Sequence, residues 1–268
     1  MIQTDFVSTK RGISVLPYSA EPVNFRHLSW DFKTEHSTAG AAPKAKYDGK
    51  YYKLSSYNRD TGFYGDEAIT ECVVSDILDS MGVDHIKYNL TMGNVVYMGN
   101  EYITPVCISE DFNSEAKPTV SIERYLETHC PGMKPFEACL HLGWSKYVYT
   151  MFIVDFLVIN RDRHGANIEI LNGHPTAMFD HGASLITLQD YKVWNHWSSD
   201  KVNNYIGSYS LTENLHRISV DEWPEVRAPS VEIIERYSNF WPADKITFVQ
   251  KMLVERWKYI EQMREERG

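Results

Sequence analysis

Short apolar stretches separated by turn signals dominate the first 110 residues. They are rich in Ile, Val and Tyr, which favours antiparallel strands, and they cover residues 45–54, 85–90, 94–98 and 101–108. Within the first stretch, the Asp48-Gly49 pair supplies the positive φ angles of a tight hairpin turn. From Gly65 to Met81 the apolar positions recur at helical spacing and Gly82 follows, which predicts one amphipathic helix.

Helical spacing of apolar positions prevails after Asn113. The expected helices cover residues 122–128, 136–157, 229–240 and 243–264. Residues 160–185 interrupt this pattern, because polar residues cluster there between short apolar runs around an Asn172-Gly173 turn signal. The sequence therefore predicts an α+β fold, with an antiparallel sheet and one helix in residues 1–110 and a mainly helical part in residues 111–268.

Composition indicates a folded globular chain without a membrane span. Hydrophobic residues make up 43% and charged residues 24% of the chain, close to ordinary globular usage. The most apolar run, Val148 to Ile159, is shorter than a membrane span and is interrupted by Asp155. The N-terminal segment has neither the apolar core of a secretory signal nor the bias of a transit peptide, so we expect a cytoplasmic protein.

Charge and cysteine spacing argue against two further classes of protein. A net charge of -9, without a stripe of Lys and Arg, disfavours general binding to nucleic acid. The cysteines, at positions 72, 107, 130 and 139, form no CxxC pair, so neither a disulfide framework nor a zinc site is predicted. We expect them to be small core residues.

Polar residues that could take part in catalysis or metal binding gather after the long apolar helix, in the segment VINRDRHGANIEILNGHPTAMFDHGAS. In phosphoryl transfer to a hydroxyl, one aspartate takes the proton of the acceptor, while an asparagine and a second aspartate hold magnesium. Asp162 and Asn167 are five positions apart, so one loop can present both side chains. Asp180 then ends the next apolar strand, which is expected at residues 177–179.

The DRHxxN loop followed by an apolar strand that ends in Asp resembles the HipA-like serine/threonine kinases, including the smaller CtkA type. This resemblance implies a bilobal kinase fold, with a nucleotide-binding lobe in residues 1–110 and a helical catalytic lobe in residues 111–268. It also implies ATP and Mg²⁺ as cofactors, Asp162 as catalytic base, and Asn167 and Asp180 as magnesium ligands. Protein kinases proper carry HRD and Asp-Phe-Gly instead, so the match is to the atypical branch.

The upstream segment HSTAGAAPKAKYDGKYYKL resembles the phosphate loop of that family and its lysine-bearing strand. By this resemblance Lys53 contacts the nucleotide phosphates and Glu71 holds Lys53, with Glu67 as the alternative. The backbone around Ser37 and Thr38 would cradle phosphate oxygens, and either hydroxyl is a candidate for autophosphorylation. The adenine would lie against the connection between the lobes, near Val106 and Ile108. We expect His164 to brace the loop by hydrogen bonding.

Three functions remain open from the sequence. The first is a protein kinase that binds ATP and a hydroxyl-bearing protein substrate. The second is a phosphatidylinositol or small-molecule kinase, because lipid kinases share the DRHxxN loop, although no basic membrane-facing segment is evident. The third is a nucleotide-binding pseudokinase. HipA toxins also carry an extra N-terminal region and work with a DNA-binding antitoxin; the chain is too short for that whole region, so an antitoxin partner stays open.

Overall fold

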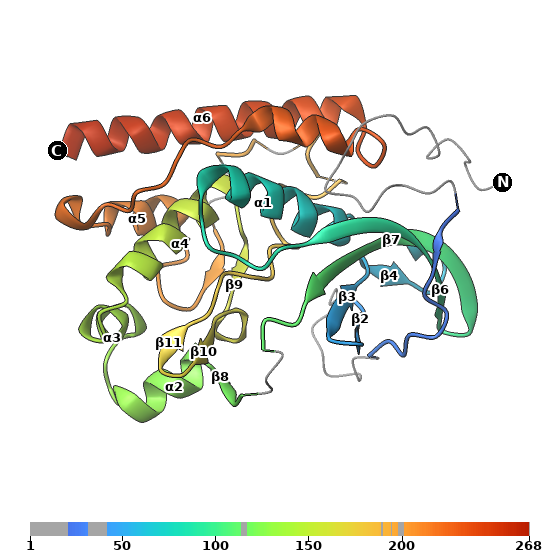
Figure 1. Cartoon of the computed structure of the whole chain (residues 1–268). Helices are drawn as coiled ribbons and strands as arrows, with labels where there is room; N and C mark the ends of the chain where they lie inside the picture. Colours follow the sequence, from blue (N-terminus) through green and yellow to red (C-terminus); the bar gives the residue numbers. More distant parts are fainter. Residues whose placement is uncertain are drawn as a thin grey trace.

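The computed structural model describes residues 21–31, 42–113, 117–188, 190–193, 195–197 and 201–267. Within these ranges the chain combines antiparallel strands with helices, which is the predicted α+β class. Figure 1 shows a sheet region at one side and a helical region at the other, with the long helix α6 (Ala243–Arg267) lying across the top.

The larger sheet has five strands in the order β1-β6-β7-β3-β2. These strands are β1 (Val23–Asn24), β2 (Lys44–Tyr47), β3 (Lys50–Lys53), β6 (Asn89–Tyr97) and β7 (Asn100–Glu110). Strand β1 runs parallel to β6, and the other neighbours are antiparallel. Asp48 and Gly49 join β2 to β3 with φ angles of 48° and 69°, as predicted for the hairpin. A small hairpin, β4 (Tyr57–Asn58) and β5 (Gly62–Phe63), follows.

The sequence predicted a break between two strands, 85–90 and 94–98, and this prediction is wrong. Residues 94–98 do not start a new strand, because β6 runs without a break through Gly93. A Cβ at Gly93 would lie 2.4 Å from the Val106 side chain and 2.7 Å from the Phe25 ring. The glycine therefore allows close packing between β1, β6 and β7 rather than a turn.

Helix α1 (Glu67–Met81) connects the sheet to the helical region. It ends at Gly82, whose φ of 74° gives the left-handed cap that the sequence predicts. One side of α1 packs against β6 and β7, and another packs against the 3₁₀ segment η4 (Val231–Tyr237). Its apolar side chains belong to the same hydrophobic core as those of the C-terminal helices. The position of α1 is thus fixed from both sides.

The helical region departs from the prediction in two places. The expected helix 136–157 is divided into α3 (Pro135–His141) and α4 (Ser145–Val158), because Gly143 adopts a φ of 76°. The expected helix 229–240 is the shorter η4, in which backbone bonds join residues three apart, such as Ser238 N to Glu235 O. The remaining helical elements are α2 (Ile122–His129), η2 (Gly165–Asn167), α5 (Leu211–His216) and η3 (Val220–Glu222).

Two small sheets shape the segment after α4. Strands β8 (Thr119–Ser121), β10 (Glu169–Leu171) and β11 (His174–Pro175) form one, with the predicted Asn172-Gly173 turn at φ angles of 52° and 79°. Strands β9 (Asp162–Arg163) and β12 (Asn203–Asn204) form the other and run parallel. The expected strand at 177–179 makes only an isolated bridge, between Met178 and His85.

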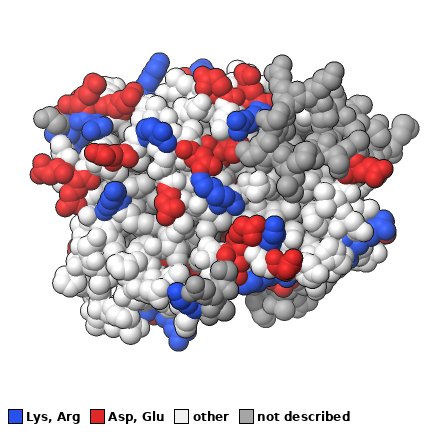
Figure 2. All heavy atoms as spheres, in the orientation of Figure 1, with Lys and Arg blue, Asp and Glu red and all other residues white. Residues whose placement is uncertain are grey.

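All four cysteines are free and buried, as expected of small core residues. Cys72 of α1 and Cys107 of β7 lie with their Sγ atoms 3.6 Å apart, between the helix and the sheet. In the described part of the chain, no helix has the length and apolar character needed to cross a bilayer. On the described part of the face in Figure 2, basic and acidic side chains lie interspersed.

A buried ion pair fastens the start of α1 to α6. Lys245 is fully buried, and its Nζ contacts the carboxylate of Asp66, the residue that precedes α1. Lys245 Nζ also donates to Ile186 O over 3.1 Å and lies 4.3 Å from the centre of the Trp241 ring. Burial lowers the pKa of Lys245, and Asp66 opposes that effect. The pair therefore links α1, α6 and the segment after Asp180.

We predict that Lys245→Met lowers the free energy of unfolding by about 3–5 kcal/mol, because the substitution leaves Asp66 buried without its counter-charge. Urea denaturation followed by circular dichroism measures this change. Lys251→Met is the control, since Lys251 is exposed and pairs with Glu255 on the same helix; its expected effect is below about 0.5 kcal/mol. Asp66→Asn added to Lys245→Met should recover part of the loss, and equal effects of the two lysine variants would contradict the prediction.

Candidate active site

Arg163 is the centre of the polar network behind the site. Its side chain is fully buried, and its guanidinium contacts Asp155 of α4, with Nη2 2.9 Å from Oδ1 and Nε 3.2 Å from Oδ2. Nη1 donates to Phe179 O over 2.8 Å, and Nη2 lies 3.3 Å from His181 Nδ1. One side chain thus joins α4, the loop after it, and both neighbours of Asp180.

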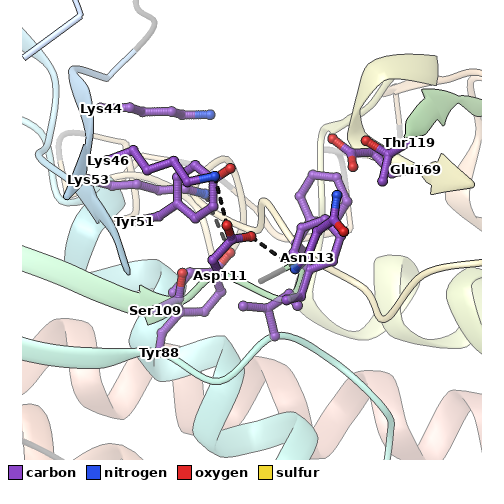
Figure 3. A pocket seen from close by; sticks show the side chains of 13 residues that line it. Lys44, Lys46, Tyr51, Lys53, Tyr88, Ser109, Asp111, Asn113, Thr119 and Glu169 are labelled. Atoms are coloured by element: carbon purple, nitrogen blue, oxygen red, sulfur yellow. Dashed lines mark hydrogen bonds and ion pairs between the residues drawn. The ribbon is translucent and has the colours of Figure 1, made fainter. Parts of the chain in front are cut away.

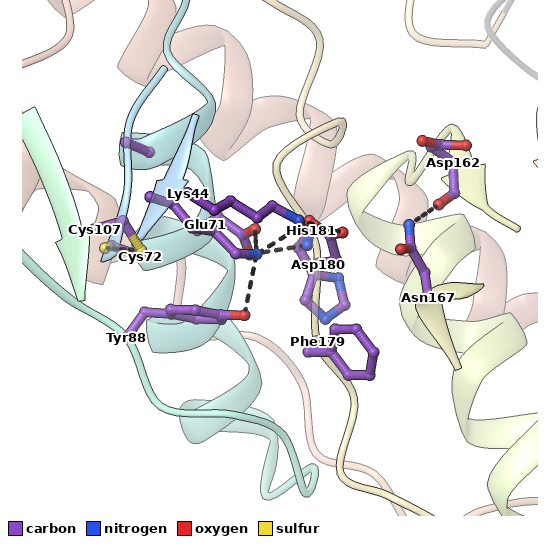
Figure 4. Close-up of polar contacts among 12 residues, drawn as sticks. Lys44, Glu71, Cys72, Tyr88, Cys107, Asp162, Asn167, Phe179, Asp180 and His181 are labelled. Atoms are coloured by element: carbon purple, nitrogen blue, oxygen red, sulfur yellow. Dashed lines mark hydrogen bonds and ion pairs between the residues drawn. The ribbon is translucent and has the colours of Figure 1, made fainter. Parts of the chain in front are cut away.

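The loop after α4 presents Asp162 and Asn167 together. The Asn167 amide Nδ2 donates to Asp162 O over 2.8 Å, and Asp162 N donates to Asn160 Oδ1 over 3.1 Å. His164 Nδ1 accepts a hydrogen bond from Ala166 N over 3.2 Å, so this histidine braces the loop as expected. The Asp162 carboxylate is half-buried and remains accessible. Figure 4 shows Asp162 and Asn167 on the side of the site opposite Lys44 and Glu71.

Lys53 lies between two carboxyl groups on the other side of the site. Its Nζ is 2.5 Å from Glu71 Oε1 and 3.1 Å from Asp180 Oδ1. Glu71 Oε2 accepts from the backbone N of His181 over 2.9 Å. The alternative, Glu67, instead accepts from Ser56 N over 3.0 Å. Of the two glutamates weighed for Lys53, the structure brings Glu71 to it.

A second lysine, which the sequence analysis did not single out, also contacts Asp180. Lys44 Nζ lies 3.4 Å from Asp180 Oδ2, and the antiparallel register of β2 and β3 sets Lys44 opposite Lys53. The two-residue Asp48-Gly49 turn fixes which residues face each other across the two strands, and so pairs Lys44 with Lys53. The position of Lys44 could therefore have been predicted from the sequence.

The surroundings of Asp180 keep it ionised. Burial opposes its charge, but Lys53 and Lys44 outweigh burial and hold the pKa of Asp180 well below its usual range. Burial likewise opposes the charge of Lys53, while Asp180 and Glu71 hold the pKa of Lys53 well above its usual value. Burial raises the pKa of Glu71, and Lys53 counteracts this. Asp180 has a φ of 60°, a left-handed conformation that is unusual for a residue other than glycine.

A cavity of about 420 Å³ opens in front of these groups (Figure 3). Lys44, Lys46 and Lys53 line it, together with Tyr88 and Phe179. Beyond the end of β7 its lining continues through residues 111–113, where Lys46 Nζ pairs with Asp111 Oδ2 over 2.7 Å. The cavity is thus both basic and aromatic.

Val106 and Ile108 do not line this cavity. Both side chains are buried in a separate hydrophobic cluster of the sheet region, with Tyr52 and Leu54. Because both side chains point to the packed face of β7, they are not placed to contact an adenine in this cavity, contrary to the expectation. Ser109, Asp111 and Phe112, which follow them in the chain, line the cavity instead. Ser37 and Thr38 lie outside the described residues.

The donor set suits a hard cation held jointly with a ligand. In the described ranges no three His, Cys, Asp or Glu side chains cluster as a metal site. Asp180 supplies an ionised carboxylate, and Asn167 uses its NH₂ on Asp162 O, which leaves its amide oxygen for a cation. Mg²⁺ commonly takes one or two protein oxygens and completes its shell with phosphate oxygens and water. The residues present therefore fit magnesium bound together with a phosphate ligand.

Comparison with known proteins supports the fold. No family model and no curated protein matches the chain. Among solved structures, the chain is similar to the Helicobacter pylori proinflammatory kinase CtkA, with a TM-score of 0.59 and 16% identity over 92% of this chain and 98% of that one. HipA of Shewanella oneidensis, solved with HipB and operator DNA, gives a TM-score of 0.42 and 16% identity over 88% of this chain and 68% of that one. The expected resemblance to CtkA-type kinases is thus confirmed for the fold.

We predict that Asp155→Asn lowers the Tm by roughly 6–15 °C, because it leaves the buried Arg163 without its counter-charge at a cost of about 3–5 kcal/mol. Differential scanning calorimetry measures the Tm. Glu101→Gln serves as the control, since Glu101 pairs with Arg26 at the surface, where both side chains are about half exposed. A Tm for Asp155→Asn equal to that of the control would show that Arg163 does not depend on Asp155.

Proposed function

We propose that the chain is an ATP- and Mg²⁺-dependent serine/threonine protein kinase of the HipA-like type. The observation that carries the proposal is that Lys53, which lines the cavity, contacts both Glu71 and Asp180. Asp162 and Asn167 lie on the other side of this cluster (Figure 4). Such an arrangement provides separate groups for the nucleotide phosphates, for the cation and for the acceptor hydroxyl. The CtkA-like fold supports the same assignment.

In this proposal the protein acts mainly by positioning and by electrostatic stabilisation. Asp162 accepts the proton of the acceptor hydroxyl while the hydroxyl oxygen forms a bond to the γ-phosphorus of ATP. The bond between that phosphorus and its bridging oxygen breaks, and ADP leaves with the electron pair. Asp180 and Asn167 would hold Mg²⁺, which would offset charge on the phosphates.

The nucleotide would occupy the cavity that Lys44 and Lys53 share with aromatic residues. Both ammonium groups contact Asp180, the proposed ligand of the cation. They would therefore lie close to the phosphates that share this cation, and would bind phosphate oxygens. The base would lie among Ile86, Tyr88 and Phe112, the apolar and aromatic side chains that line the cavity. This replaces the position near Val106 and Ile108 expected from the family.

The chain would then divide into a nucleotide-binding lobe, residues 1–110, and a catalytic lobe, residues 111–268. Strand β7 ends at Glu110 and the next strand begins at Thr119, so a short connection separates the two parts. The α1 helix belongs to the first lobe by sequence and shares the core of the second.

Transfer of labelled γ-phosphate from ATP and Mg²⁺ tests the proposal. The acceptors are the protein itself, a generic basic protein and phosphoinositide vesicles. We expect label on protein, whereas label on the vesicles would indicate a lipid kinase. Nucleotide binding without any transfer would favour a pseudokinase. Intact mass after incubation with ATP reports autophosphorylation, and peptide mapping would then decide whether Ser37 or Thr38 carries it.

We predict that Asp162→Ala lowers kcat by about 10²–10⁴-fold and leaves ATP affinity nearly unchanged, because it acts on the acceptor. Asp180→Ala should instead weaken the magnesium-dependent part of nucleotide binding. Asp221→Ala, at an exposed position of η3, is the control and should match wild type in both assays. Transfer by Asp162→Ala at the wild-type rate would refute the assignment of the base.

We also predict that Lys44→Ala weakens MgATP binding by about tenfold, the effect of losing one charge-assisted hydrogen bond. Lys50→Ala is the control on the neighbouring strand β3, because Lys50 pairs with Glu110 at the surface and does not line the cavity. Isothermal titration with a non-hydrolysable ATP analogue measures both. If Lys50→Ala costs as much affinity as Lys44→Ala, the contact of Lys44 with Asp180 has no special role in binding the phosphates.

A further inference from the structure

Strand β12 brings one amide side chain to the carboxylate of Asp162. Asn203 of β12 lies opposite Asp162 of β9 in the parallel pair. Its Nδ2 donates to Asp162 Oδ1 over 3.2 Å, although the two residues are 41 positions apart in the chain. A segment distant in sequence therefore contacts the proposed base directly.

The main chain holds β12 in place without help from the Asn203 side chain. Asn203 N donates to Arg161 O, and Tyr205 N donates to Arg163 O, both over 3.0 Å. The following turn is fixed by Asn204, whose Oδ1 accepts from Ile206 N over 3.0 Å and from Gly207 N over 2.8 Å. The contact of the Asn203 amide with Asp162 is thus additional to the bonds that build the strand pair.

The carboxylate of Asp162 has little else to orient it. The side chain is 46% exposed, and the Asn160 and Asn167 bonds reach its backbone rather than its carboxylate. Near the second carboxylate oxygen, His164 Nε2 lies 3.7 Å from Oδ2, which is longer than a hydrogen bond. A terminal carboxylate rotates over a broad range unless a partner holds it. Asn203 supplies such a partner on Oδ1.

Asn203 also lines a surface groove of about 780 Å³, together with Tyr209 and Glu213. Tyr209 is 72% exposed. The residue that contacts the proposed base therefore also faces an open groove at the surface.

We propose that Asn203 is a positioning residue for phosphoryl transfer: by donating to Oδ1 it orients the Asp162 carboxylate so that Oδ2 receives the proton of the acceptor hydroxyl. This inference rests on the proposed kinase function and deepens it. The bonds made and broken are those of the transfer step described above, and Asn203 exchanges no proton. Its effect should therefore appear in kcat rather than in ATP binding.

The test compares Asn203→Asp, Asn203→Ala and Asn203→Gln in the γ-phosphate transfer assay across pH. Asn203→Asp has the same shape but places a second carboxylate beside Oδ1, and two adjacent carboxylates retain a shared proton to higher pH. We expect the acidic limb of its kcat/KM profile to move up by about one pH unit. Asn203→Ala should lower kcat about tenfold at an unchanged KM for ATP. Asn203→Gln, which can still donate, should recover activity to within about threefold of wild type.

Asn100→Asp is the charge-matched control, because Asn100 is an exposed asparagine at the distant turn between β6 and β7. Its pH profile should match that of wild type. If wild type transfers phosphate and Asn203→Asp shows no shift relative to this control, the positioning role is refuted while the kinase function stands. If wild type transfers nothing to any acceptor, the proposed function itself fails. The unfolding curves of the three Asn203 variants should coincide with that of wild type. A purely structural role of Asn203 would instead lower the stability of the variants without moving the acidic limb of the pH profile.

Discussion

The candidate site depends on one buried ion pair, Arg163 with Asp155. Asp155 lies in the buried, apolar second half of α4, and Arg163 follows Asp162 directly. Removing two charges from water costs several kcal/mol each, so such a pair contributes little net stability. It contributes geometry instead: the guanidinium also binds Phe179 O and approaches His181, which flank Asp180. The same side chain therefore sets the position of the DRHxxN loop relative to Asp180.

The second constraint is the shared core around α1. Glu71 reaches Lys53 only if α1 lies close to β3, and the helix packs against β6 and β7 on one side and η4 on the other. Buried polar contacts strengthen this arrangement, since Asp66 meets Lys245 and Asp76 Oδ2 accepts from Tyr237 Oη over 2.9 Å. Moving α1 away from the sheet would expose apolar surface and break these contacts together. The Lys53 to Glu71 contact is thus built into the packing of the fold.

Local signals predicted much of this structure. The Asp48-Gly49 hairpin, helix α1 with its Gly82 end, and the loop that presents Asp162 and Asn167 together all follow from short-range patterns. The errors arise where distant packing decides. Gly93 reads as a turn residue, but Val106 and Phe25 occupy the space of its missing side chain. The contacts of Asp155 and Asn203 join residues far apart in the chain or hidden in an apolar run, and no spacing rule identifies them from one sequence.

The charge arrangement explains how a buried site can be ready for a charged ligand. The ammonium groups of Lys44 and Lys53 face the carboxyl groups of Glu71 and Asp180, so the cationic and anionic groups compensate one another without a ligand. Under the proposed function, a nucleotide with bound magnesium would exchange these partners. The lysines would turn to phosphate oxygens and Asp180 to the cation. These side chains are already in place. The reorganisation needed on binding is therefore small, which is the condition under which electrostatic stabilisation of a transferred phosphoryl group is most effective.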